Sequence, residues 1–568
     1  YKRQVYGKAL PASVGYIGTS AFDNSSIKSI DLSGNKLTEI SNSTFAKADL
    51  SEGIKLPEGL LKIGSGAFNS SKLKGIVMPN SVTEIGTDCF RDARALLDVV
   101  LSKNLKVIPS GAFQSAGFGG TVTSDNGVIW EGTGDLNNHI QISYNGVTAA
   151  ESMLEEIGDA AFNCSSVNDC AFLSDLKRLK KIGTKAFAFA DFTTLTLPAS
   201  LETLGEEAFQ AIWSLEEVYF EEGSKVTEFP RALFGAYITD TSAPIPVRDK
   251  AIYPCYNLKK VQFPEGLLSI GRGCFSYCVN LKTGGYSGKM TEGEMNFPKQ
   301  LDAIGAYAFS HCAAYDPKEA PMIGGLVMVK NTGVEKIFVP DSVTEIGAAA
   351  FEECYYLNTL SIGKGVTEIP ERMCYKCGEY PYENGSRKQE KDQLMVDGKV
   401  VISKQEYTSE NYTPLTFYGL KTLNLSDNVQ KIGNSAFENC YALTLDNKNG
   451  WLPTGLTEIG SSAFKKCKSL TKVVFGSELT TIGVSAFEEA VQQLEETPAK
   501  PVNPSDKINH QYYGLSEIDF TYATSLNKIG SNAFKNTNIA AIIFPEGVTA
   551  LPSEVCSGSY NLKTVTAG

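Results

Sequence analysis

Residues 456–475 read Leu456-Thr-Glu-Ile459-Gly460-Ser-Ser-Ala463-Phe464-Lys-Lys-Cys467-Lys-Ser-Leu470-Thr-Lys-Val473-Val474-Phe475, and this pattern returns along the whole chain. Its most regular part is Ile-Gly-x-x-Ala-Phe, and we call the position of its Phe the marker. Cysteines fill the marker at Cys374 and Cys556. Phe fills it at Phe22, Phe45, Phe68, Phe90, Phe113, Phe162, Phe187, Phe209, Phe234, Phe275, Phe309, Phe351, Phe437, Phe464, Phe487 and Phe534.

The spacing of the markers predicts the fold class. Uninterrupted copies are 22, 23 or 25 residues apart, and a period in the twenties is typical of a leucine-rich-repeat solenoid. The units of such a stack contact only their neighbours, so a chain of 568 residues does not require several domains. We predict one mostly β solenoid over residues 1–568, with about 18 repeats. It is expected to be a right-handed superhelix with short parallel strands on its concave face.

A second copy shows where the strand lies. It reads Ile27-Lys-Ser-Ile30-Asp-Leu32-Ser-Gly-Asn35-Lys-Leu37, which fits the template of apolar residues at the first, fourth and sixth positions followed by Asn and Leu. We therefore predict a strand over residues 27–32, with Ile30 and Leu32 pointing into the core and Asp31 pointing outward. A proline follows the strand in most copies and ends it, because proline has no N–H for the ladder.

The Ile-Gly-x-x-Ala-Phe half is predicted to lie opposite the strand. Its Gly permits a tight or left-handed turn, and its Ala allows close approach of neighbouring copies. The marker rings of successive copies should then stack into one interior spine.

Insertions interrupt the period at six places, about 117–150, 236–254, 283–297, 313–330, 378–416 and 491–513. Asp125-Asn126-Gly127 and Val396-Asp397-Gly398-Lys399 predict β-hairpin turns, since Asn-Gly and Asp-Gly favour the type I′ turn. Gly324-Gly325 predicts a third hairpin. The segments 236–254, 283–297 and 491–513 are rich in Pro, Gly and polar residues and are predicted to be loops. Insertions in solenoids tend to lie on one face, which is often the binding face.

Composition and charge exclude some partners. The net charge is −12 and no run of Lys and Arg occurs, so we expect no nucleic-acid partner. No apolar run reaches the roughly 18–20 residues that span a bilayer, so we expect no membrane insertion within this chain. Tyr1-Lys2-Arg3 starts in mid-pattern without a signal peptide; any export signal or anchor is expected outside this sequence.

The 13 cysteines all fit repeat positions. Cys170 is expected at an inward strand position, and Cys255 is expected in the slot three residues after the marker, displaced by an insertion. A free cysteine behaves as a small buried hydrophobe, so we predict buried thiols, with an occasional disulfide between stacked copies left open. The other cysteines in the slot three residues after the marker are Cys278, Cys312, Cys354, Cys377, Cys440 and Cys467.

Three motifs resemble parts of metal-binding or catalytic sites, but none has all the residues that such a site needs. Cys374-Tyr-Lys-Cys377 lacks the second pair that a zinc site needs. His311-Cys312 lacks a further base nearby, since the only other histidines lie in distant insertions and a nucleophile must be within hydrogen-bond reach of its base. Asp135-Leu-Asn137-Asn138 lacks the spacing of a calcium loop. We therefore predict no catalytic residue, no cofactor and no metal site.

The outward strand residues are the candidate ligand contacts. A β surface favours Val, Thr and Tyr in any case, but aromatic residues are enriched at binding hot spots. From this column we select Val77, Val100, Thr196, Tyr219, Gln262 and Phe338, and from the Tyr-rich insertion Tyr380 and Tyr382. The whole predicted column is Asp31, Lys55, Val77, Val100, Ala171, Thr196, Tyr219, Gln262, Phe338, Ser361, Asn424, Val474, Asp519, Ile543 and Thr566.

These motifs resemble the BspA-like (Treponema pallidum type) class of bacterial leucine-rich repeats, whose pattern is L-x-x-I-x-[LF]-P-x-x-[VL]-x-x-I-G-x-x-A-F-x-x-C. The resemblance covers nearly the whole chain outside the insertions. It implies a bacterial protein exported to the cell surface or secreted, and adhesion to a host protein or glycan, for example an extracellular-matrix glycoprotein such as fibronectin or fibrinogen. A fold alone does not identify a ligand.

Two hypotheses follow from the sequence. The first is a non-catalytic, adhesin-like surface or secreted protein that binds host proteins or glycans through its solenoid face. The alternative is a structural spacer or scaffold of the cell envelope without a ligand of its own. Uninterrupted copies would favour the spacer, whereas the large irregular insertions favour recognition.

Overall fold

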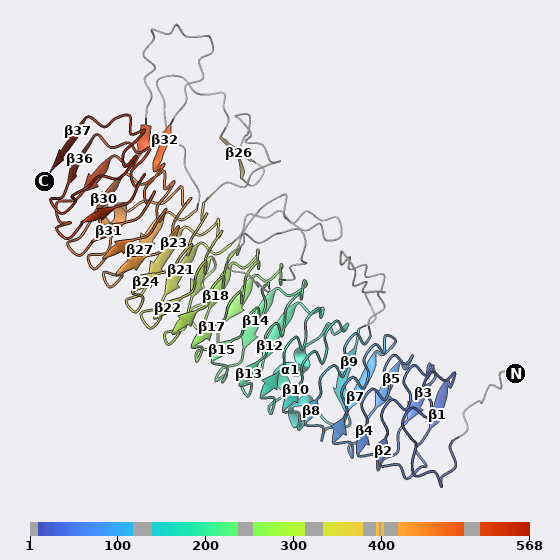
Figure 1. The fold of residues 1–568 in the computed structure, drawn as a ribbon. Coiled ribbons are helices and arrows are strands. Elements are labelled where there is room, and N and C mark those ends of the chain that lie inside the picture. The colour runs from blue at the N-terminus through green and yellow to red at the C-terminus, as the bar shows by residue number, and fades with distance from the viewer. Residues whose placement is uncertain are drawn as a thin grey trace, which may run out of the picture. The chain divides into compact units, whose positions relative to one another are not determined.

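The computed structural model describes residues 9–117, 139–236, 254–312, 333–378, 394–396, 399–402, 419–493 and 512–567. They form two compact units, Tyr1–Cys278 with Tyr286–Gly288, and Val279–Gly285 with Lys289–Gly568. A typical repeat makes one coil, with a main strand, a bend, a short strand of two residues and a turn around the marker. The prediction of a mostly β repeat fold with parallel strands is confirmed (Figure 1). The number of copies and their continuity as one stack stay predictions.

In the first unit, the two kinds of strand lie along different sides (Figure 1). The coils also carry a 3-10 helix, η1 (Ala149–Glu151), and a short helix, α1 (Ala171–Asp175). The main strands are β1 (Ser29–Asp31), β3 (Gly53–Lys55), β5 (Gly75–Val77), β7 (Asp98–Leu101), β9 (Gln141–Tyr144), β12 (Thr194–Leu197), β14 (Glu217–Phe220) and β16 (Lys260–Gln262). The short strands are β2 (Glu39–Ile40), β4 (Lys62–Ile63), β6 (Glu84–Ile85), β8 (Val107–Ile108), β10 (Glu156–Ile157), β11 (Lys181–Ile182), β13 (Thr203–Leu204), β15 (Glu228–Phe229) and β17 (Ser269–Ile270).

The second unit repeats this plan and adds a 3-10 helix, η3 (Asp446–Lys448). Its main strands are β18 (Thr283–Gly285), β19 (Glu294–Asn296), β21 (Lys336–Val339), β23 (Thr359–Ile362), β27 (Thr422–Asn424), β30 (Lys472–Val474), β34 (Glu517–Asp519), β36 (Ala541–Phe544) and β37 (Thr564–Ala567). Its short strands are β20 (Ala303–Ile304), β22 (Glu345–Ile346), β24 (Glu368–Ile369), β28 (Lys431–Ile432), β29 (Glu458–Ile459), β31 (Thr481–Ile482) and β35 (Lys528–Ile529). Two hairpins are β25 (Leu394–Val396) with β26 (Lys399–Ile402), and β32 (Val491–Gln493) with β33 (Tyr512–Gly514).

The core follows the alternation of the strands. In β1, Ile30 is buried between two partly exposed neighbours, and Leu32 directly after the strand is also buried, as predicted. The second residue of each short strand is buried as well, for example Ile40, Ile63 and Ile459. Full burial of one such side chain stabilises the fold by roughly 1.5–3 kcal/mol.

The marker rings form the predicted stack. In the first unit ten rings, Phe22 to Phe275, follow one another with centroids 5.1–5.8 Å apart. In the second unit, Phe309 stacks on Phe351 at 5.9 Å, and Phe437 begins a second stack that ends at Phe534. Cys374 occupies the marker of the coil between these two stacks.

The turn around the marker is held by alternating hydrogen bonds. The residues two before and two after the marker are left-handed, as at Ser462 (φ 56°) and Lys466 (φ 63°) around Phe464. Their amides and that of the marker donate to the next coil, while the residues between them bond back within the turn. The bonds to the next coil are Ser462 N to Val484 O (2.9 Å), Phe464 N to Ala486 O (2.8 Å) and Lys466 N to Glu488 O (2.8 Å).

The glycine of Ile-Gly has a different role from the predicted one. Gly86, Gly205 and Gly483 have no left-handed φ, so the prediction of a left-handed glycine was wrong at this position. A Cβ would lie 2.3 Å from the Ser65 nitrogen if added to Gly86, and 2.3 Å from the Gly183 carbonyl carbon if added to Gly205. Glycine is therefore needed because the backbones of neighbouring coils approach too closely for any side chain.

Prolines divide the short strands into separate ladders. In most coils the amide of the Ile-Gly glycine donates to the preceding short strand, for example Gly86 N to Ile63 O at 2.8 Å. Pro109, Pro230 and Pro370 replace this glycine after β8, β15 and β24, and each of these strands is unpaired with the short strand before it. Proline has no N–H to donate, so the ladder ends wherever it occurs.

Five insertions leave their coils at the same place. Each insertion lies between a marker turn and the main strand that follows it. The last described residues before the gaps are Gly117, Ala236, Cys312, Gly378 and Gln493, and the strands that follow are β9, β16, β21, β27 and β34. We call this position, between the marker turn and the main strand, the insertion corner.

The structure changes the content of several insertions. The predicted 117–150 segment contains the main strand β9, and the predicted loop 283–297 contains two main strands, β18 and β19. The predicted loop 491–513 begins and ends with the β32–β33 hairpin. Val396 pairs with Lys399, so the hairpin predicted there is confirmed. The turns predicted at 125–127 and 324–325 lie outside the described residues, as do nearly all of 236–254 and 313–330.

Candidate binding surface on the main-strand face

Outward residues of the main strands form a column that runs from coil to coil. The parallel register matches the predicted column at most positions, although the role of these residues in binding stays a prediction. The observed pairs are Asp31 with Lys55, Val77 with Val100, Thr196 with Tyr219, Phe338 with Ser361, Ser361 with Asn424, Val474 with Asp519 and Ile543 with Thr566.

Three positions of the column differ from the prediction. Ala171 begins α1 and is not in a strand, and Cys170 precedes this helix instead of taking an inward strand position. The Asp169 side chain accepts a hydrogen bond from the Ala171 amide at 2.8 Å, and such a local bond favours a turn over a strand. Two residues absent from the predicted column also belong to it: Ser143 lies opposite Val100, and Asn296 lies opposite Phe338.

Tyr219 is fixed by polar neighbours on its own face. Its hydroxyl donates to Glu217 Oε2 at 2.5 Å, and Lys260 Nζ lies 5.1 Å from the ring centroid. The hydrogen bond with Tyr219 raises the pKa of Lys260. In the adjacent strand, Gln262 Nε2 donates to Phe220 O at 3.3 Å. A ligand at this point would therefore contact one aromatic ring that is flanked by the charged side chains of Glu217 and Lys260.

Apolar candidates are exposed at two other points of the column. Val77 is 56% exposed and Phe338 is 36% exposed. Phe338 lies between two polar residues, Asn296 and Ser361. An exposed phenyl ring between polar neighbours can anchor a partner. Tyr380 and Tyr382 lie outside the described residues, so the structure does not place them.

An aromatic pair that the sequence analysis did not single out lies in the second unit. The rings of Trp451 and Tyr522 have centroids 5.1 Å apart and are tilted by 39°. Trp451 forms a parallel bridge with Val474, which places it in the outward column. The sequence analysis missed it because the chain between Thr444 and Trp451 leaves the strand as η3. The signal was Asn449-Gly450, a dipeptide typical of turns.

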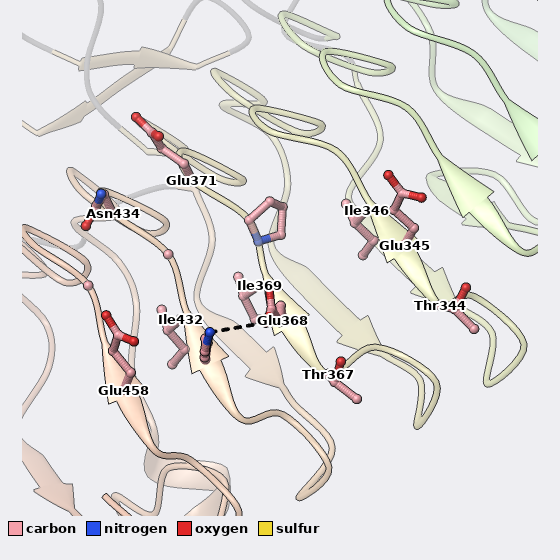
Figure 2. A pocket seen from close by; sticks show the side chains of 14 residues that line it. Thr344, Glu345, Ile346, Thr367, Glu368, Ile369, Glu371, Ile432, Asn434 and Glu458 are labelled. Atoms are coloured by element: carbon pink, nitrogen blue, oxygen red, sulfur yellow. Dashed lines mark ion pairs between the residues drawn. The ribbon is translucent and has the colours of Figure 1, made fainter. Parts of the chain in front are cut away.

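The short strands carry a different surface, a shallow groove of about 550 Å³ in the second unit. It lies beside Pro370, where the ladder between β22 and β24 is interrupted. Figure 2 shows Glu345, Glu368 and Glu458 projecting from separate strands over buried isoleucines, with Lys431 paired to Glu368 at 3.5 Å. Its open, acidic lining shows no buried polar group that would mark a ligand site.

A partly buried ionic cluster connects three successive marker turns. His311 Nε2 lies 3.0 Å from Glu353 Oε2, and Lys376 Nζ lies 3.3 Å from Glu353 Oε1. Burial alone would raise the pKa of Glu353, but the hydrogen bonds and charges of His311 and Lys376 outweigh it and lower this pKa to about 2. Burial raises the pKa of the adjacent Glu352 despite its ion pair with Arg372. These partners tie His311 to a structural role.

The cysteines form a ladder of thiols along the marker turns. A cysteine three residues after the marker donates to the carbonyl of the marker in the preceding coil, as Cys354 does to Phe309 O at 3.1 Å. The prediction of buried thiols is confirmed for 11 of the 13 cysteines, whereas Cys164 and Cys556 are partly exposed. The same bond is made by Cys255 to Phe209, Cys278 to Phe234, Cys377 to Phe351, Cys440 to Cys374 and Cys467 to Phe437.

Nowhere in the described ranges do three or more His, Cys, Asp or Glu side chains gather closely enough to hold a metal ion. In the same ranges no helix has the length and apolar character needed to cross a membrane.

The family can now be assigned. The model of the BspA type leucine rich repeat region (6 copies) matches residues 7–118, 141–239, 286–382, 411–511 and 446–563, which is more than half of the chain. The chain belongs to the BspA-type leucine-rich-repeat family. A comparison with curated proteins gives no match.

Several solved structures resemble this BspA-type chain. A leucine-rich repeat protein from Bacteroides ovatus shares 19% identity, with 89% of this chain and 87% of that chain covered and a TM-score of 0.45. A leucine rich cell surface protein from Faecalibacterium prausnitzii shares 17% identity over 84% and 89%, with a TM-score of 0.33. The leucine rich repeat protein of T. pallidum shares 19% identity over 52% and 79%, with a TM-score of 0.23.

Within this BspA-type chain, constant and variable positions are separated in space. The marker Phe, the Ala before it and the Ile of Ile-Gly are buried in coil after coil. The outward column changes its chemistry from one strand to the next, as Val77, Tyr219 and Phe338 show. The repeat therefore keeps the interior constant, while the outward column varies from coil to coil.

Proposed function

We propose that this chain is a non-catalytic surface or secreted protein that binds a host protein or glycan through its main-strand face, in the manner of an adhesin. Membership of the BspA-type family supports a binding role, because leucine-rich-repeat stacks offer long surfaces built for recognition. An extracellular-matrix glycoprotein is one partner class that fits.

One observation carries this proposal. The main strands hold an in-register column in which neighbouring coils present different side chains, while the interior keeps the same residues. A spacer has no need for such variation on one face. The five insertions that start at the insertion corner, directly before main strands, favour recognition for the same reason.

Export is part of the same proposal. It rests on family membership and on the resemblance described above. We expect the chain on the cell surface or in the medium of the organism that makes it. Surface labelling of intact cells, followed by fractionation, tests this location independently of any ligand.

The binding test uses the whole chain. Purified protein is applied to immobilised matrix glycoproteins and mucin-type glycans at physiological salt, and saturable binding to one member is expected. A combined variant with Tyr219→Ser, Phe338→Ser, Tyr380→Ser and Tyr382→Ser should lose at least tenfold in affinity. The matched control is Tyr16→Ser, since Tyr16 is 72% exposed but lies outside the column.

Each outcome decides between the alternatives. Binding that the combined variant weakens supports a site on the main-strand face. Unchanged affinity in that variant refutes the site. A negative result across the panel refutes the adhesin-like role as stated and favours an envelope scaffold.

A further inference from the structure

The geometry points to a saccharide site at Trp451 and Tyr522 in the second unit: we propose that this aromatic pair stacks on the ring of a neutral sugar. The inference deepens the proposed function, on which it rests, by naming a place and a ligand class on the main-strand face. Its first support is position. Trp451 lies in the outward column opposite Val474, and Val474 lies opposite Asp519 of the strand that leads to Tyr522.

Trp451 and Tyr522 come from the two coils on either side of the coil that contains Val474, and their rings meet above that coil. Val474 lies in that coil and is only 2% exposed, although Val77 at the equivalent position of the first unit is 56% exposed. Tyr522 itself is 52% exposed and Trp451 is partly exposed. The two rings thus form an apolar platform over Val474 on the strand face.

Local backbone geometry holds Trp451 in place. Thr444 forms a parallel bridge with Thr422 of β27, and the chain then leaves the sheet as η3. It returns to the sheet at Trp451 through two left-handed residues, Asn449 (φ 51°) and Gly450 (φ 85°). A Cβ on Gly450 would lie 2.7 Å from Lys472 Cγ, so only glycine fits this return. Val474 N donates to Gly450 O at 2.8 Å and locks the turn to the next strand. A platform fixed in this way is preorganised, which lowers the entropic cost of binding.

Polar atoms of the pair are left for a ligand. Within the described ranges the indole N–H of Trp451 and the hydroxyl of Tyr522 have no hydrogen-bond partner in the protein. An indole N–H is a donor and a phenol is both donor and acceptor. A sugar ring offers the matching pattern, an apolar C–H face for stacking and hydroxyl groups at its edge.

The surroundings favour a neutral sugar over a charged one. Asn447 Nδ2 donates to Asn424 Oδ1 at 2.6 Å, so uncharged amides border one side. Lys472 is paired with Glu517 at 2.5 Å, and Asp519 accepts the Thr521 amide at 2.9 Å. Lys472 is thus neutralised by Glu517, and the Asp519 carboxylate is held by a local hydrogen bond. Aromatic rings combined with a few polar groups are the usual lining of small-ligand sites.

The test uses the whole chain and an array of neutral oligosaccharides of glucose, mannose, galactose and N-acetylglucosamine, followed by calorimetry with each soluble hit. Binding of at least one class is expected. Trp451→Ala and Tyr522→Ala should each weaken it at least tenfold, whereas Tyr16→Ala, which removes a more exposed ring outside the column, should leave it unchanged. Trp451→Phe should retain part of the affinity, because it keeps the ring and loses the N–H.

A second measurement avoids any effect of the variants on folding. Hydroxyl-radical footprinting of the wild-type chain should show Trp451 and Tyr522 protected by the bound oligosaccharide and Tyr16 unprotected. No binding on the array, or protection of neither residue by a hit, would overturn the proposal. Binding of a proline-rich peptide to the pair, without any sugar, would also overturn it, since such peptides dock on aromatic surfaces too.

Failure of this site is distinguishable from failure of the proposed function. If a matrix glycoprotein or mucin glycan binds, but no free oligosaccharide competes and Trp451→Ala binds as the wild type, the saccharide site is wrong and the broader role stands. If no member of that panel binds, but a free oligosaccharide does so through Trp451, the saccharide site stands and the adhesin-like role is wrong.

Discussion

The ring of Phe113 stacks on that of Phe162 with centroids 5.1 Å apart and planes 4° from parallel, although an insertion separates the two residues in the sequence. This contact is as close as those between uninterrupted coils, such as Phe90 with Phe113. The interior of the first unit therefore continues past the insertion without a defect.

Removing one stacked ring should loosen the coils beside it. Phe162→Ala deletes a fully buried side chain, and such a deletion costs about 3–5 kcal/mol. Because repeat arrays depart from two-state unfolding, the measurement is hydrogen exchange read coil by coil. We expect faster exchange around Phe113 and Phe187 and little change near Phe45. Tyr16→Ala is the control, and uniform loosening of all coils would contradict the local picture.

Adding one methyl group to a close-approach glycine should be costly. In Gly205→Ala the new Cβ would lie 2.3 Å from backbone atoms of Gly183 and Thr184, so the backbone must shift, at a cost of about 1–3 kcal/mol. Gly59→Ala is the matched control, because nothing lies within 4 Å of a Cβ there. It should be neutral or stabilising by up to about 1 kcal/mol. Equal effects of both variants on the denaturation midpoint would refute close approach as the reason for glycine.

Restoring an amide should join two ladders of short strands. Pro370→Gly supplies the N–H that equivalent coils donate to the preceding short strand, and the acceptor here would be the Ile346 carbonyl. We expect slow hydrogen exchange of the new amide at position 370, measured by NMR or mass spectrometry. Exchange at the rate of an exposed amide would show that the ladder is interrupted for another reason than the missing donor.

Acid should weaken the coils that share Glu353. The pKa of Glu353 is lowered to about 2 in the folded chain from an ordinary 4.5. A depressed carboxyl pKa adds stability above the unfolded value, and this stability is lost as pH falls from about 4.5 to 2. Glu353→Gln should therefore destabilise these coils at pH 7, by about 2–4 kcal/mol, and flatten their acid dependence. Glu345→Gln, at an exposed carboxylate, serves as control in hydrogen exchange against pH.

Thiol reactivity should follow burial. Burial raises the pKa of Cys556, and burial together with Asp92 raises that of Cys164, each to about 11. Both thiols are nonetheless partly accessible. In native protein at pH 8, iodoacetamide should label these two slowly and the other 11 cysteines hardly at all, because the thiolate is the reactive form. Rapid native labelling of Cys354 or Cys377 would contradict the buried ladder.

The sequence was sufficient to predict the positions at which one residue type recurs because it fills the same place in every coil. The marker Phe and the apolar strand positions predicted the ring stack and most of the column, because period and alternation are set by the backbone. Prediction from the sequence failed where a local hydrogen bond or turn diverts the chain from the repeat conformation. Asp169 turns the chain into α1 at Ala171, and Asn449-Gly450 delays Trp451 until after η3. The strand in residues 141–144 was missed because an insertion in the sequence displaces it from the repeat spacing.

The role of glycine shows a second limit. Ile-Gly alone does not reveal whether glycine is needed for a left-handed φ or for close approach, since both leave the same letter in the sequence. Only the neighbouring coil, visible in three dimensions, shows that Gly86 faces the Ser65 backbone. The candidate surface shares this limit, because the exposed fraction of Val77 or Val474 depends on side chains from other coils.

The insertion corner has a consequence for how such a chain can change. The ring stack continues across four of the five insertions, the exception being the one that follows Cys374, so the length of polypeptide that leaves there has little effect on the interior. Recombination could exchange one such segment for another, and the host coil would keep its folding energy. The chain can thus serve as a display scaffold. A foreign epitope or a small domain inserted between residues 236 and 254 would be presented without a redesign of the core.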